Sequence, residues 1–130
     1  MDFHYTVTTD KSIKDAIAAL EANLKEKKFG VLWHLDLTAK LKEKGVTGYP
    51  LPYHILEVCQ PSKAAGVLNR NKLAGYFLPC KLTVYRTENR TTRIGLAKPT
   101  ALIGLLDDPG LTDTAKKVET ILIDVLDESK

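Results

Sequence analysis

The sequence has little of the residues and patterns that mark specialised proteins. Its 130 residues include only two cysteines, one tryptophan and one methionine. Two cysteines exclude a disulfide-rich scaffold, and a composition of 44% hydrophobic and 27% charged residues excludes a disordered chain. The longest mostly apolar stretch, residues 101–106, is far shorter than a membrane span of ~20 residues. We therefore expect one domain over residues 1–130 and no membrane partner.

Common catalytic and nucleotide-binding patterns are also missing. The eight glycines are dispersed and form no phosphate-binding loop, and the sequence has neither a C-x-x-C nor a G-x-S-x-G pattern. The net charge of +3 is spread along the chain, so we predict no nucleic-acid partner. Because the N-terminus lacks a basic start followed by an apolar run, we expect a cytoplasmic protein with reduced cysteines.

Hydrophobic periodicity predicts the order of the elements. Residues 3–8 alternate as in a strand, and Ser12 precedes a helix whose apolar positions recur at helical spacing. Further strands are expected over residues 31–35, 53–59, 77–86 and 93–97, with the last two forming a hairpin. Short helices are expected from residue 36 or 38 to 44 and over 62–68, and a long one from about residue 112.

This order predicts an α+β fold with a largely antiparallel sheet of about five strands and two main helices on one face. The other face of the sheet would then be open. The residues expected there are His4, Thr6, His34, Lys81, Thr83 and Tyr85. A small domain with an exposed sheet face commonly associates with a second copy, so we expect a homodimer.

The two cysteines are the first candidates for a functional site. Cys59 closes one predicted strand, and Cys80 lies near the start of another, each close to a proline. Two thiols brought together would form a soft-metal site, for example for zinc with His34 as a further ligand, or a redox pair or a reactive thiolate. The alternative is that both are small buried hydrophobic residues.

Other polar residues extend the candidate site. His34 and Asp36 share one side of a strand, which suits a base and its orienting carboxylate or two metal ligands, although Asp36 is also well placed to cap the next helix. Glu57 interrupts an apolar strand, and Lys81 follows Cys80, so both are candidates for binding a ligand. The alternative for Glu57 and Lys81 is a solvated, charged sheet surface.

The chain resembles the uncharacterised family called domain of unknown function 302. The resemblance rests on Asp36, Lys44-Gly45, the block of residues 55–61 with Ala64, the block of residues 78–85, and Pro99. It implies a strand–helix–four-strand–helix domain, related in outline to the TATA-binding-protein fold and usually homodimeric, and it implies no activity. Family members typically have Asn where this chain has Gln60.

Three hypotheses follow from these observations. The first is a homodimeric binding module whose site is built around Cys59 and Cys80, with a small molecule or a soft metal ion as ligand. The second is an enzyme with Cys59 as nucleophile, His34 as base and Asp36 as orienting group. The third is a structural dimer in which the cysteines only pack.

Overall fold

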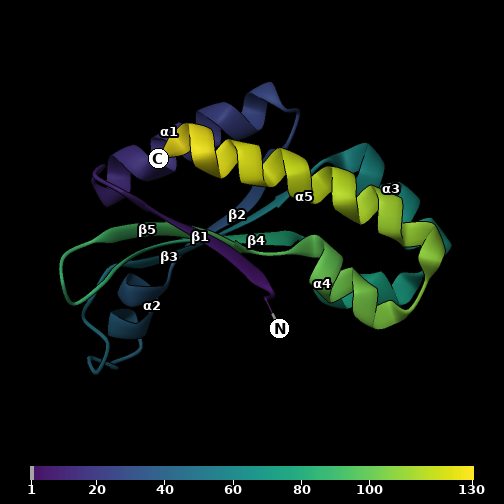
Figure 1. The fold of residues 1–130 in the computed structure, drawn as a ribbon. Helices are drawn as coiled ribbons and strands as arrows, with labels where there is room; N and C mark the ends of the chain where they lie inside the picture. Colours follow the sequence, from purple (N-terminus) through teal and green to yellow (C-terminus); the bar gives the residue numbers. More distant parts are fainter. Residues whose placement is uncertain (1) are drawn as a thin grey trace.

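The computed structural model describes residues 2–130 and has the predicted α+β fold. A five-stranded sheet, antiparallel throughout, crosses the middle of the molecule in the order β1-β5-β4-β3-β2 (Figure 1). The strands are β1 (His4–Thr9), β2 (Gly30–Asp36), β3 (Tyr53–Cys59), β4 (Cys80–Arg86) and β5 (Thr92–Ala97). Strands β1 and β2 therefore form the two edges of the sheet.

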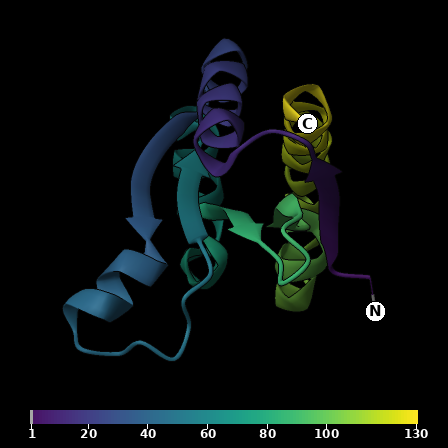
Figure 2. The same ribbon diagram turned by 90° about the vertical axis from the view of Figure 1, so that its left-hand side faces the viewer.

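Two long helices, α1 (Ile13–Glu26) and α5 (Pro109–Ser129), pack on one face of the sheet and contact each other (Figure 1). The shorter helices are α2 (Leu37–Glu43), α3 (Pro61–Arg70), α4 (Pro99–Ile103), η1 (Lys72–Phe77) and η2 (Gly104–Leu106). Figure 2 shows α2 and the loop after it projecting away from the two long helices. None of the helices within residues 2–130 has the length and apolar character needed to cross a membrane.

Local sequence explains how α1 begins and where it packs. The Ser12 hydroxyl accepts a hydrogen bond from the Asp15 amide at 3.1 Å, as the predicted cap requires. The apolar stripe of the helix faces the sheet, and Leu20 and Leu24 are fully buried. They join a main core formed with side chains of the covered sheet face, which include Leu56, Val58, Leu82, Val84, Ile94 and Leu96.

A second, smaller apolar cluster lies beyond the end of the sheet. It consists of buried Ala74, Ile103, Leu111 and Ala115, with partly buried Val67, Phe77, Leu78 and Leu106 against it. The first half of α5 belongs to this cluster and the second half to the main core. Helix α5 therefore joins the two apolar clusters.

The structure corrects several predicted boundaries. The strand predicted over residues 77–86 begins only at Cys80, because residues 72–77 form η1 and Pro79 has no N–H to donate to a sheet. The last helix begins at Pro109 rather than near residue 112, since Pro suits the first turn and Asp108 accepts a hydrogen bond from the Gly110 amide at 3.1 Å.

The prediction that His34 lies on the open face was wrong. A β-bulge at Leu32 shifts the register between Val31 and Trp33, so the side-chain alternation of β2 changes face at that point. Trp33 then pairs with Glu57 on the open face, whereas His34 pairs with the buried Leu56 on the helix-covered face. A prediction that assumes strict alternation along the strand cannot detect a single extra residue, so it assigns the residues after the bulge to the wrong face.

Candidate functional site

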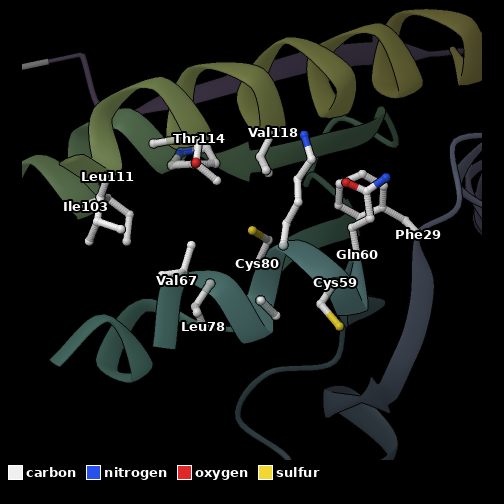
Figure 3. A pocket seen from close by; sticks show the side chains of 14 residues that line it. Phe29, Cys59, Gln60, Val67, Leu78, Cys80, Ile103, Leu111, Thr114 and Val118 are labelled. Carbon is white, nitrogen blue, oxygen red and sulfur yellow. The ribbon is translucent and has the colours of Figure 1, made fainter. Parts of the chain in front are cut away.

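An apolar cavity of ≈ 50 Å³ lies at the boundary between the two apolar clusters, bordered by α3, α5 and the start of β4 (Figure 3). Its apolar lining includes Phe29, Val67, Leu78, Ile103, Leu111 and Val118. A water needs at least ~10–15 Å³ of such volume, so this cavity can hold several water-sized groups.

Strand register places Cys80 in this cavity. Cys80 is the first residue of β4, and its side chain lies on the same face as those of Leu82 and Val84. Burial raises the pKa of the Cys80 thiol to about 11, with a smaller contribution from Cys59. The thiol is therefore protonated at neutral pH, so it packs as a small hydrophobic group and is a weak nucleophile.

The structure does not form the predicted two-cysteine site. The residue opposite Cys80 in the sheet is Val58, so the next residue, Cys59, directs its side chain to the other face. Figure 3 shows the sulfur of Cys59 pointing away from the cavity that contains Cys80. Within residues 2–130, no group of three or more His, Cys, Asp or Glu side chains is arranged to hold a metal ion.

Gln60 is a residue of the cavity that sequence reasoning did not select. Its Nε2 donates a hydrogen bond to the Lys27 carbonyl at 3.3 Å. Its Oε1 is buried and has no hydrogen-bond partner among the described residues. A buried acceptor without a partner costs about 1–3 kcal/mol, so a bound donor at this position would be favourable. The signal available in the sequence was the position of Gln60 between Cys59 and the start of a helix.

The predicted residues His34 and Asp36 line a different hollow, between α1, α2 and the ends of β2 and β3, with a volume of ≈ 710 Å³. His34 Nε2 lies 2.9 Å from His54 Nδ1, and His54 Nε2 lies 3.9 Å from Asp36 Oδ2. Burial lowers the pKa of His54, and the Asp36 carboxylate partly opposes that shift. Asp36 also caps α2, as predicted, by accepting a hydrogen bond from the Ala39 amide at 3.0 Å.

His54 was missed because the sequence contains no spacing that links it to Asp36, whereas the antiparallel register places the two residues opposite each other. Cys59 lies at the far end of β3 from His54 and does not line this hollow. The structure therefore does not bring Cys59, His34 and Asp36 together as a nucleophile, base and orienting group.

Glu57 and Lys81 lie directly opposite each other on β3 and β4, on the open face of the sheet. Both line a third hollow of ≈ 240 Å³. Tyr76, which is 83% exposed, stands at the same hollow. Cys80 also lines this hollow, so the structure brings three of the four predicted ligand-binding residues to one place. The Cys80 side chain lies on the helix-covered face of the sheet, and those of Glu57 and Lys81 lie on the open face.

Comparison with known proteins identifies the family. The family model described as "Domain of unknown function DUF302" matches residues 5–129. A crystal structure of an uncharacterized conserved DUF302 protein from Bacillus stearothermophilus is 49% identical, with a TM-score of 0.94 and complete coverage of both chains. No curated protein matches the chain. The sequence, the fold and these two matches agree, and the chain belongs to the DUF302 family.

Proposed function

We propose that this protein is a small homodimeric binding module that takes a small organic ligand into the cavity beside Cys80. The observation that carries the proposal is the buried Gln60 Oε1, which has no hydrogen-bond partner among residues 2–130 and belongs to a side chain lining a mostly apolar cavity. Ligand sites typically combine an apolar lining with a few polar groups that fix orientation. A ligand with an apolar chain and one hydroxyl or N–H group would satisfy both parts of this cavity.

The surroundings of Cys80 support an organic ligand rather than a soft metal ion. Within the described residues 2–130, no group of three or more His, Cys, Asp or Glu side chains is placed to hold a metal ion, and the lining around Cys80 is mostly apolar. The direction of the Cys59 side chain, away from the cavity, removes the second thiol that such a metal would require. The ligand-binding hypothesis therefore moves from a pair of cysteines to Cys80, Gln60 and the apolar walls around them.

The test uses 1-hexanol, which carries an apolar chain and one hydroxyl donor, and follows backbone amide shifts by NMR. Ala64 lines the cavity, whereas the adjacent Ala65 is exposed and does not. We expect hexanol to shift amides near Val67 and Leu111 in the wild type and in Ala65→Leu. We expect Ala64→Leu, which fills the cavity, to abolish these shifts. Absent shifts in the wild type, or equal shifts in both variants, would rule out binding in this cavity.

The open sheet face supports the homodimer. It carries Trp33, 52% exposed, and a stacked pair of rings, Tyr53 and Tyr85, with centroids 5.1 Å apart. Glu57 and Lys81 add charges of both signs to the same face. An isologous two-fold interface requires a self-complementary surface, and a patch with aromatic rings and both charges can meet a copy of itself.

Sedimentation equilibrium tests this association directly. We expect the wild type to have twice the 14.4 kDa mass of the chain. Ile55→Lys places a charge among the open-face residues of β3, and we expect it to produce a monomer. Leu105→Lys adds the same charge at a residue that is 66% exposed and lies outside the sheet, so it should remain dimeric. A monomeric wild type, or a dimer that survives Ile55→Lys, would contradict the proposed interface.

A further inference from the structure

We infer that the ligand of the Cys80 cavity is an amphipathic organic anion, an inference that rests on the proposed binding function. Two further hollows, of ≈ 310 Å³ and ≈ 400 Å³, adjoin the cavity along α3 and α5. Lys63 lines the cavity and both of these hollows. A molecule with its apolar end in the cavity would therefore place its other end beside the Lys63 ammonium group.

The charged residues around Lys63 in the cavity and the two hollows are all positively charged. The charged residues that line the cavity and the two hollows are Lys63, Arg70, Lys116 and Lys117, and no Asp or Glu lines any of the three. Arg70 forms an ion pair with Asp108 at 2.9 Å. No ion pair within residues 2–130 involves the three lysines. These three cations define a basic rim that lacks an anionic partner.

The chemical class of the ligand follows from this juxtaposition. An apolar wall favours a hydrocarbon group, because burial removes its surface from water. Beside it, a cluster of cations raises the local concentration of anions and attracts a carboxylate, sulfonate or phosphate group. A neutral alcohol of the same chain length would gain the apolar contact and a hydrogen bond to Gln60 Oε1, but no attraction to the rim. A cationic ligand would be repelled by the rim.

The experiment compares hexanoate, 1-hexanol and hexylammonium, which share one chain and differ in the charge of the head group. Affinities come from NMR titration of the wild-type protein at neutral pH. We expect hexanoate to bind about 3–10-fold more tightly than hexanol, because its ion pairs with several exposed lysines, about 0.2–1 kcal/mol each, together outweigh the hydrogen bond of about 0.5–1.5 kcal/mol that only the hexanol hydroxyl donates to Gln60 Oε1. Hexylammonium should bind most weakly. Adding salt to 1 M should reduce the advantage of hexanoate and leave hexanol unchanged, since only the charged contact is screened.

Matched variants locate the charge effect. Lys63→Gln and Lys117→Gln should each lower hexanoate affinity about 2–5-fold and leave hexanol affinity unchanged, the range of one exposed ion pair. Lys25→Gln removes an exposed lysine from α1 and should change neither. If hexanol and hexanoate bind equally and the lysine variants have no effect, the anion inference is overturned while the binding function stands. If no ligand binds in the cavity, the proposed function itself fails.

Discussion

The strongest quantitative prediction concerns the reactivity of Cys80. Burial raises the pKa of its thiol to about 11, against an ordinary value of 9.0. At pH 8 the thiolate share should be roughly one in a thousand in the folded protein and roughly one in ten in the unfolded chain, because each pH unit is a factor of ten. Alkylation requires the thiolate, so native Cys80 should react about a hundredfold more slowly than denatured Cys80 even before restricted access is considered.

The assay measures iodoacetamide labelling of Cys80 by peptide mass spectrometry between pH 7 and pH 11. The variant Cys59→Ser leaves Cys80 as the single thiol, and labelling in guanidinium gives the unfolded reference. We expect the native labelling rate to rise about tenfold per pH unit up to about pH 10 and more slowly toward pH 11, whereas the denatured rate should level off above pH 9. A native profile that levels off near pH 9 or below would refute the argument from burial.

The same pKa shift has a consequence for stability, with a definite sign. Below pH 9 both states keep the Cys80 proton, so the thiol has no pH-dependent effect. Between pH 9 and pH 11 the unfolded chain releases the proton while the folded protein retains it, so the folded state loses up to about 2–3 kcal/mol. Cys80→Val, which removes the titrating group, should therefore lose less stability over this range than the wild type does in urea titrations.

The remaining predictions concern packing, glycine and capping, and all are read from urea or thermal unfolding. Leu82→Ala should lower the free energy of unfolding by about 2–5 kcal/mol, because Leu82 is fully buried. Leu105→Ala, at an exposed site, should change it by no more than about 0.5 kcal/mol. Similar losses for both variants would contradict the assigned core. Gly95→Ala should destabilise the fold, since the new Cβ would lie 2.8 Å from Thr6 Oγ1. Gly66→Ala should stabilise it by about 0.4–1 kcal/mol, because Gly66 lies in helix α3 and a Cβ there meets nothing within 4 Å. The opposite order of stability for these two variants would refute the assignment of Gly95 as the crowded position. Ser12→Ala should cost about 1 kcal/mol, and no loss would show that the α1 cap is dispensable.

The sequence predicts most of the fold because its periodic segments are long and unambiguous. The apolar stripe of α1 and the alternation in β3 and β4 each follow one period over several residues, and the structure buries the expected sides of these elements. Errors occurred where one residue breaks a period. The bulge at Leu32 moved His34 to the other face, and Pro79 delayed the start of β4.

The candidate site was predicted less well, for a reason of register. Cys59 and Cys80 both lie at strand ends, as predicted, but whether two residues on paired strands share a face depends on an offset of one residue. Val58, rather than Cys59, is the partner of Cys80. The same register brings His54 opposite Asp36, and no local sequence motif predicts this pairing. Cys80 was therefore found from its motif, whereas His54 required the paired strands, and Gln60, at the start of α3, required the structure around its side chain.

The cavity has a geometric origin in the different lengths of the elements that meet there. Helix α5 has 21 residues and spans about 31 Å at 1.5 Å per residue, whereas the seven residues of β4 span about 23 Å. About one and a half turns of α5 therefore extend beyond the sheet, and the second apolar cluster covers this extension. Cys80 is the first residue of β4 and lies at the boundary between the main core and the second apolar cluster. The small Cys80 side chain leaves the cavity open between the two clusters.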